Sequence, residues 1–264
     1  MTKIISFANQ KGGVGKTTST INVASSLALD SHKVLVIDMD PQANLTQVLA
    51  STTDHDLSIY DLLIPSQHPQ KNTITLNQVL TKTYLDNLDI LPSNVLLSSA
   101  ELDLVPLHSR ETVLKRLLKT YKKDLESYDF ILIDCQPSLG LLTINSIIAS
   151  DHIMIPLHAD VFSLTGLELL IQTVEKLQEV FEINCTILGF FFTQTHTKET
   201  LFKEAYNLCK ENYKNQLCKT YIKSNSAIDH ANATDQSILT FDKNSSASID
   251  YTCLTKEILE KLSL

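Results

Sequence analysis

The segment NQKGGVGKTT, residues 9–18, constrains the fold of this chain more than any other. The chain has only six glycines in 264 residues, and three of them, Gly12, Gly13 and Gly15, lie within four positions. Glycine permits positive φ angles and a close approach of the backbone to a ligand. An apolar run at 4–8 predicts a strand before the segment, and residues 17–29 predict a helix after it. A glycine-rich turn between a strand and a helix is typical of a phosphate-binding loop.

The spacing within this loop predicts roles for its side chains. Gly15, Lys16 and Thr17 match the end of the pattern G-x-x-x-x-G-K-[ST], although Gln10 occupies the place of its first glycine. We expect backbone N–H groups to face phosphate oxygens, Lys16 to reach the β- and γ-phosphates, and the Thr17 hydroxyl to ligate Mg²⁺. The predicted nucleotide-binding residues of the loop are Lys11, Gly12, Gly13, Val14, Gly15, Lys16, Thr17 and Thr18.

Two other interpretations of the glycine cluster are a turn without a ligand and a dinucleotide-binding site. Residues 13–18 half-match G-x-G-x-x-G, and Asp38 follows about 20 residues further on, as such a site requires. Thr18, however, fills the place of the third glycine, and two lysines exceed what a diphosphate needs. The residues therefore favour ATP as the ligand over a dinucleotide.

Two further apolar runs end in carboxylates. Residues 34–37 are followed by Asp38 and Asp40, and residues 130–133 are followed by Asp134. Carboxylates at strand ends beside a phosphate loop are where Mg²⁺ and the attacking water are managed. Four apolar residues before Asp134 form a Walker B pattern, which predicts that Asp134 holds Mg²⁺. A competing interpretation is that Asp38 or Asp40 caps the next helix.

The rest of the chain alternates apolar runs with amphipathic stretches. This alternation predicts an α/β fold, a doubly wound and mostly parallel sheet with helices on both faces, as in P-loop NTPases. The predicted strands are 4–8, 34–37, 88–91, 130–133, 152–155, 186–192 and, more weakly, 219–222. The predicted helices are 17–29, 96–125, 139–149, 164–180, 198–213 and 245–262. We expect one domain over residues 1–264, with a polar insertion or long loop near 51–85 that contains Pro65 and Pro69.

Composition excludes several classes of protein. The chain contains no run of 18 apolar residues, so no membrane-spanning helix is predicted. The amino-terminal residues do not resemble a signal peptide. Five cysteines without a C-x-x-C pair indicate reduced thiols and a cytoplasmic protein, and Cys135 is expected to be buried and inert. A net charge of −8 argues against uniform attraction to nucleic acid, although a local basic patch remains compatible with it.

The motifs KGGVGKTT, DMDPQ and IDCQPSLGLLTIN together resemble the ParA/MinD group of ATPases, which carries a deviant Walker A motif. The sequences of these motifs are most similar to those of ParA/Soj-type partition ATPases of chromosomes and plasmids. Similar segments recur at 155–170, 189–201 and 241–259, so the resemblance covers essentially the whole chain. It implies a slow, partner-stimulated ATPase that uses ATP and Mg²⁺ and forms an ATP-dependent homodimer.

The resemblance also implies roles for individual residues. Lys11 crosses the dimer to the phosphates of the other subunit, and Lys16 serves its own subunit. Asp40 orients the hydrolytic water, so the implied catalytic residues are Lys11, Lys16 and Asp40. Asp38 supports the metal beside Thr17 and Asp134, which makes these three the implied metal residues. Thr193 and Gln194 lie near the adenine.

This chain departs from the family pattern at several places. Gln136 stands where the family has a proline, and His196 stands where it has Asp or Asn, which we interpret as a solvated loop position. The segment YIKSNSAIDHANAT replaces the family's I-P-R segment, so residue roles are carried over least securely there.

The implied partners are a ParB-like centromere-binding protein and non-specific DNA, which would place the protein in the cytoplasm on the nucleoid. Candidate DNA-binding residues are Lys198, Lys203, Lys210, Lys214, Lys219 and Lys223, although interleaved acids also fit an ordinary solvated surface. The carboxy-terminal LTKEILEKLSL lacks a basic excess, which favours a packed helix over a membrane anchor. The alternatives are an ATP-dependent regulator of transcription or plasmid copy number, and a MinD-like positioning ATPase.

Overall fold

The computed structural model describes residues 1–51, 56–64 and 74–263. One seven-stranded sheet runs through it in the order β3-β4-β2-β5-β1-β6-β7, and every neighbouring pair is parallel except β3 with β4. The strands are β1 Lys3–Phe7, β2 Val34–Met39, β3 Thr81–Lys82, β4 Leu88–Leu91, β5 Phe130–Cys135, β6 His152–Leu157 and β7 Thr186–Phe192. The predicted doubly wound, mostly parallel α/β fold is confirmed.

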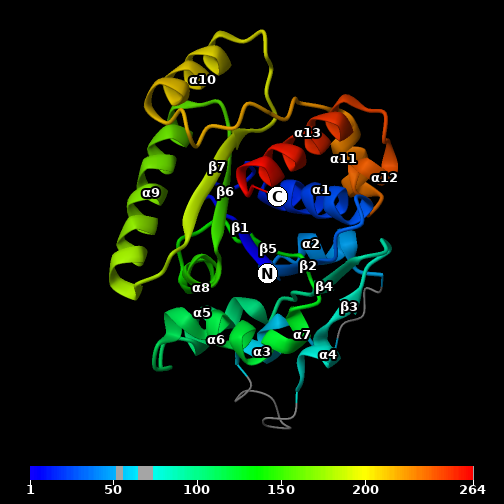
Figure 1. Ribbon diagram of the computed structural model, residues 1–264, viewed down its shortest axis with the longest axis vertical. Helices are drawn as coiled ribbons and strands as arrows, with labels where there is room; N and C mark the ends of the chain where they lie inside the picture. Colours follow the sequence, from blue (N-terminus) through cyan, green and yellow to red (C-terminus); the bar gives the residue numbers. More distant parts are fainter. Residues whose placement is uncertain (52–55, 65–73, 264) are drawn as a thin grey trace.

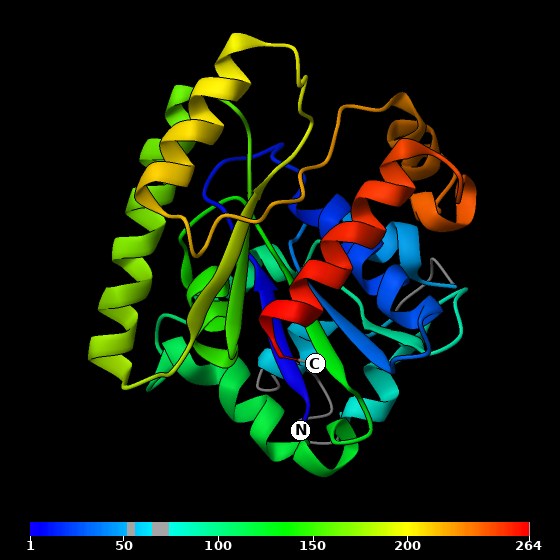
Figure 2. The same ribbon diagram turned by 45° about the horizontal axis from the view of Figure 1, so that its top comes forward.

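Helices cover both faces of the sheet (Figure 1). One face carries α1 Lys16–Leu29, α2 Asn44–Leu49, α11 Ser226–Ala233, α12 Ile238–Phe241 and α13 Ser246–Lys261. The other carries α3 Ile59–Leu63, α5 Leu97–Asp103, α6 Val113–Thr120, α8 Leu141–Ala149 and α9 Val161–Phe181. The remaining helices are α4 Leu76–Val79, α7 Lys122–Leu125 and α10 Thr200–Asn212. The carboxy-terminal helix α13, red in Figure 2, packs against α1.

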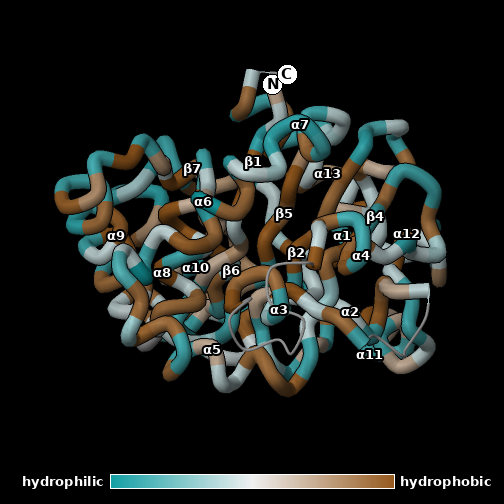
Figure 3. The backbone as a smooth tube through the Cα atoms, turned by 90° about the horizontal axis from the view of Figure 1, so that it is seen from below, coloured by the Kyte–Doolittle hydropathy of each residue, from teal (hydrophilic) through white to brown (hydrophobic). Residues whose placement is uncertain are grey.

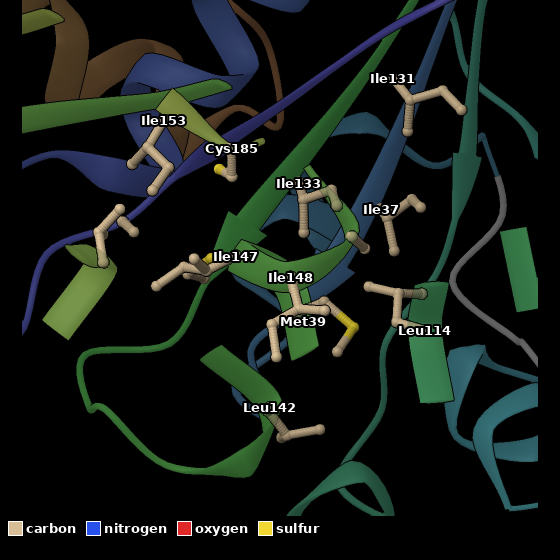
Figure 4. Packing of buried hydrophobic residues seen from close by; sticks show 14 of the residues in the cluster. Ile37, Met39, Leu114, Ile131, Ile133, Leu142, Ile147, Ile148, Ile153 and Cys185 are labelled. Carbon is tan, nitrogen blue, oxygen red and sulfur yellow. The ribbon is translucent and has the colours of Figure 1, made fainter. Parts of the chain in front are cut away.

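Two hydrophobic cores result from the alternation of side chains along buried strands. In β5, Ile131 and Ile133 face the core beneath α6 and α8, whereas Phe130 and Leu132 face the core beneath α1 and α13. Figure 4 shows the first of these cores, with Leu114 of α6 and Ile148 of α8 close to the strand residues. The hydropathy colouring of Figure 3 shows the same central strands as mostly hydrophobic. Burial on both faces explains why these strands are continuous apolar runs.

The sheet brings the ends of β1, β2 and β5 together. Phe7 pairs with Asp134, and Asp38 pairs with Asp134, so the three strands finish in one row. The chain leaves β1 through α1 on one face and leaves β5 through α8 on the other. Crossovers on opposite faces open a crevice at the carboxyl ends of the strands, which is where α/β folds of this type bind ligands.

Three predictions about elements were wrong or incomplete. The helix expected over 96–125 is divided into α5, a 3-10 turn at Arg110–Thr112, α6 and α7. Pro106 supplies no N–H to a helix, and Ser109 adopts a φ of 53°, so the chain turns between α5 and α6. Residues 219–222, where a strand was expected, do not form one. Isolated bridges lie on either side of them, Leu217 with Phe190 and Lys223 with Thr195. Within the described residues, α11 and α12 were not anticipated.

The polar segment 51–85, for which an insertion or long loop is expected, contains α3, α4 and β3. Pro65 and Pro69, which contributed to that prediction, lie outside the described residues. Among the described helices, none has the length and apolar character needed to cross a lipid bilayer.

Candidate active site

The loop between β1 and α1 is shaped by positive φ angles and by one buried side chain. Gly13 and Gly15 have φ angles of 74° and 79°, which glycine adopts without the penalty other residues pay. The Asn9 side chain accepts from the Lys11 N–H at 2.9 Å and donates to the Pro156 carbonyl at 2.7 Å. Gly15 is the N-cap of α1 and provides no side-chain cap. The N–H groups at this helix end are therefore presented to an anion.

The two lysines of the loop lie in different environments. Lys16 is 6% exposed, and its Nζ donates to the Lys11 carbonyl at 3.0 Å, so the ammonium lies inside its own loop. Burial lowers the pKa of Lys16, an effect that the nearby Asp134 opposes. The Lys11 side chain is 40% exposed and turns away to form an ion pair with Asp160 at 2.5 Å. Only one of the two lysines is thus positioned for a phosphate in the same loop.

Asp134, at the end of β5, is fully buried beside the start of α1. Its Oδ2 accepts from the Thr17 hydroxyl at 2.7 Å and its Oδ1 from the Thr20 hydroxyl at 3.2 Å. Burial, followed by the proximity of Asp38, raises the pKa of Asp134 to about 8. Mg²⁺ binds oxygen ligands such as hydroxyl and carboxylate groups, either directly or through water. The Thr17 hydroxyl and the Asp134 carboxylate are neighbouring groups of this kind. A buried carboxyl of this kind gains strongly from a divalent cation, so Thr17 and Asp134 fit the predicted metal.

Asp38 and Asp40 occupy distinct positions after β2. Asp38 is fully buried and accepts from the Asp40 N–H at 3.1 Å, the Thr46 N–H at 2.9 Å and the Thr46 hydroxyl at 2.7 Å. Burial raises the pKa of Asp38 to about 6. Because Thr46 lies in the first turn of α2, the helix-capping interpretation describes Asp38 well. Asp40 is 9% exposed, and its Oδ1 accepts from the Gln42 N–H at 2.9 Å.

Thr193 and Gln194 follow β7 and contact the phosphate loop. The Thr193 hydroxyl donates to the Val14 carbonyl at 2.8 Å, and the Gln194 amide donates to the Gly13 carbonyl at 3.0 Å. A cavity opens beside them, next to the carboxyl end of the loop. It is lined by Gly15, Thr18, Thr193, Gln194, Ile222, Lys223, Ser224, Asn225, Ile228, Asp229, Asn232 and Tyr251. Its position is compatible with the expected location of the adenosine.

Three residues that support the site were not among the residues predicted from the sequence. Asn9, Thr20 and Asp160 each bond directly to a predicted site residue. Asp160 also caps α9, because its Oδ1 accepts from the Ser163 N–H at 2.9 Å. Asn9 begins the glycine-rich segment and Asp160 precedes a predicted helix, but neither signal identifies a hydrogen-bond partner.

Two expectations about single residues are confirmed. The Cys135 thiol is buried, and burial raises its pKa to about 12, so it is protonated and unreactive. His196 is exposed in the loop after β7.

The chain matches a protein family and its curated relatives over most of its length. A family model described as "AAA domain" (AAA_31) matches residues 2–187. The chromosome-partitioning ATPase Soj of Treponema pallidum is 38% identical over 261 residues, which cover 99% of this chain and 98% of that protein. The sporulation initiation inhibitor protein Soj of Bacillus subtilis is 36% identical over 259 residues, 98% of each chain.

Solved structures are also similar to this chain over its whole length. A plasmid partition protein from Borrelia burgdorferi B31 bound to AMPPNP superposes with a TM-score of 0.79 at 27% identity, over 100% of this chain and 99% of that one. Cobyrinic acid a,c-diamide synthase from Mycobacterium smegmatis, with an ATP analogue and magnesium, superposes with a TM-score of 0.82 at 25% identity, over 100% and 96%.

Proposed function

Since the chain belongs to the AAA-domain family of Soj/ParA-type partition ATPases, we propose that it acts as an ATP-dependent switch in the partitioning of DNA. It is an ATPase that works with ATP and Mg²⁺. In the proposed cycle ATP favours a homodimer, the dimer binds DNA non-specifically on the nucleoid in the cytoplasm, and a ParB-like centromere-binding protein stimulates slow hydrolysis.

The contrast between Lys16 and Lys11 carries this proposal. A phosphate loop that only hydrolysed ATP in one subunit would need one lysine inside the loop, and Lys16 meets that need. The Lys11 side chain points away from the interior of the loop, is partly exposed, and forms an ion pair with Asp160. An ammonium in that position can leave Asp160 for the phosphates of a second subunit. The pair therefore supports a site that is complete only in a dimer.

The chemistry assigned to the site is positioning and charge neutralisation. Lys16 of one subunit and Lys11 of the other would neutralise the charge of the γ-phosphate. Thr17 and Asp134 would hold Mg²⁺, which would supply further neutralisation of the phosphate charge. In this proposal Asp40 would orient the attacking water. Asp38 acts through its bonds to Thr46 and the Asp40 N–H, which fix the turn that carries Asp40.

Separate substitution of the two lysines tests the proposal. Lys16→Ala is expected to abolish ATP binding, because the buried ammonium inside the loop is lost. Lys11→Ala is expected to bind ATP with an affinity within about threefold of wild type but to stay monomeric, as measured by calorimetry and light scattering. Lys122→Ala, on a distant exposed lysine, is the matched control. Wild-type dimerisation by Lys11→Ala with ATP would contradict the proposal.

A second candidate is a regulator that uses the same switch. The name of the Bacillus subtilis relative, a sporulation initiation inhibitor, favours this possibility. Partners co-purified with ATP would separate the two candidates: a centromere-binding protein supports partitioning, and transcription components support regulation. The MinD-like alternative is less favoured, since Tyr251, Leu254 and Ile258 of α13 are buried in the core shared with α1.

A further inference from the structure

Glu101 of α5 makes an unusual set of contacts at the edge of the active site. Its Oε2 accepts from the Leu141 N–H at 2.9 Å, and its Oε1 accepts from the Leu142 N–H at 3.3 Å. These are the first N–H groups of α8, whose N-cap, Gly140, has no side chain to offer. A carboxylate at this position accepts from N–H groups that have no partner within the helix, and it lies at the positive end of the helix dipole. Glu101 therefore replaces a local cap, although it lies about forty residues away in the sequence.

Gly140 is the residue that lets Glu101 come so close. Its φ is −75°, which any residue adopts, so backbone freedom does not explain the glycine. A β-carbon on Gly140 would lie 2.9 Å from the Glu101 Cδ and closer still to Oε1. A free carboxylate could swing away from such a methyl group, but this one would give up its hydrogen bonds in doing so. A side chain at position 140 would therefore displace the Glu101 carboxylate from its hydrogen bonds.

The same carboxylate holds the segment that follows Asp134. The Gln136 Nε2 donates to Glu101 Oε1 at 2.8 Å, two residues beyond the predicted metal residue. Pro137, the next residue, lies against the phosphate loop, since a β-carbon on Gly12 would be 3.8 Å from the Pro137 Cβ. Residues 136–140 thus form a wall between α5 and the loop. A proline fixes its own φ, whereas a glutamine does not, and here the Gln136 side chain is held by Glu101.

We propose that Glu101 is a positioning residue for ATP hydrolysis, which ties residues 136–140 to α5 and holds them against the phosphate loop. The inference rests on the proposed roles of the loop and of Asp134. Loss of the tie lets the wall relax while Lys16, Thr17 and the loop backbone remain in place. We therefore expect kcat to fall about tenfold, because sub-ångström displacements are costly in a positioned reaction, while the Kd for ATP changes less than about threefold.

The test uses three substitutions in the full chain, measured by ATP turnover, ATP affinity and thermal melting. Glu101→Ala removes every contact, and Gln136→Ala removes only the tie to the wall and leaves the cap of α8 intact. If Glu101→Ala folds poorly, Gln136→Ala still decides the question, with an expected fall in kcat and a melting temperature near wild type. Glu101→Gln can keep one acceptor and pair with a flipped Gln136 amide, so it is expected to recover much of the lost kcat. Glu179→Ala, an exposed glutamate of α9, is the control.

A double substitution adds an independent check. Gly140→Ala alone is expected to lower kcat as Glu101→Ala does, because it expels the carboxylate. In the Glu101→Ala background the three atoms nearest to the added methyl group are absent, so the double variant should match Glu101→Ala. Wild-type kcat in Glu101→Ala and Gln136→Ala, or additive losses in the double variant, would overturn the inference. If Lys16→Ala hydrolysed ATP normally, the proposed site itself would fail instead.

Discussion

Asp40 is the residue on which hydrolysis, as distinct from binding, is expected to depend. Asp40 follows the end of β2, where Asp38 pairs with Asp134, and its Oδ1 accepts from the Gln42 N–H. We expect Asp40→Ala to bind ATP within about threefold of wild type and to hydrolyse it at least about 10²-fold more slowly, since the water loses its orienting group. Asp86→Ala, on the distant exposed turn before β4, is the control. Normal turnover in Asp40→Ala, read by phosphate release, would remove Asp40 from the mechanism.

Two buried carboxyl groups are expected to make the free energy of unfolding of the nucleotide-free protein depend on pH. Burial raises the pKa of Asp134 to about 8 and that of Asp38 to about 6, above the values of an unfolded chain. Between roughly pH 4 and pH 8 the folded state then binds more protons, so its free energy of unfolding falls as pH rises through this range. Melting temperatures recorded from about pH 5 to pH 8 should decline, and Asp134→Asn should flatten the decline. A wild-type slope retained in Asp134→Asn would show that other groups cause it.

At the scale of elements, Asp160 joins the start of α9 to the phosphate loop. It caps α9 through Ser163 and pairs with Lys11. Burial tends to raise the pKa of Asp160, but hydrogen bonds from Lys11 and Ser163 outweigh it and lower the pKa. Asn caps a helix as well as Asp does, so Asp160→Asn keeps α9 while it frees Lys11.

We expect Asp160→Asn to form more ATP-dependent dimer at a given concentration, because Lys11 no longer has to leave a charged partner. Its free energy of unfolding should change by less than about 1 kcal/mol, as for other partly exposed ion pairs. Light scattering with ATP measures the first quantity and urea titration the second. An unchanged dimer fraction would mean that the Lys11–Asp160 pair does not restrain dimerisation.

The packing of α13 on α1 supports the helix that carries the phosphate loop. Leu254 is 0% exposed in the core between the two helices, whereas Ile249 of the same helix is 55% exposed. Leu254→Ala is expected to lower the free energy of unfolding by about 2–5 kcal/mol, because it leaves a cavity. Ile249→Ala should change it by less than about 0.5 kcal/mol. Similar losses in both variants, measured by denaturant titration, would contradict this account.

Local sequence signals predicted the elements and the site to different extents. The six main strands and α1 follow from continuous apolar runs and from the loop motif, which are local signals. The break after α5 was missed because apolar spacing continued through Pro106. Glu101 and Asp160 could not be found from sequence, since each acts on residues far along the chain. Long-range hydrogen bonds leave no periodicity, so they appear only when the fold is known.

At the scale of the whole molecule, DNA binding is expected to depend on α10. Phe202, Ala205 and Cys209 are its buried face, and Lys203 and Lys210 are exposed. Lys223, by contrast, is paired with Asp250 at 2.7 Å and is a weaker candidate. Because each lost phosphate contact reduces the slope of log affinity against log salt by about one, the double variant Lys203→Ala/Lys210→Ala should lose about two units.

The matched control is Lys122→Ala/Lys123→Ala on α7, which lies at the opposite end of the molecule (Figure 1). Duplex binding should require ATP and should be measured at several salt concentrations by fluorescence anisotropy. An unchanged salt slope in the α10 variant would exclude this helix as the DNA surface. Equal affinity with and without ATP would exclude the switch.

The strand order also has a consequence for the nascent chain. β1 is synthesised first, yet its neighbours in the sheet are β5 and β6, with Lys3 beside Phe130 and Phe7 beside Met154. The phosphate loop is then held by Thr193, later still in the sequence. Contacts so distant along the chain form slowly, and they cannot form at all before most of the chain has left the ribosome. Competence to bind nucleotide is therefore acquired late in biogenesis, although the loop itself is among the first residues made.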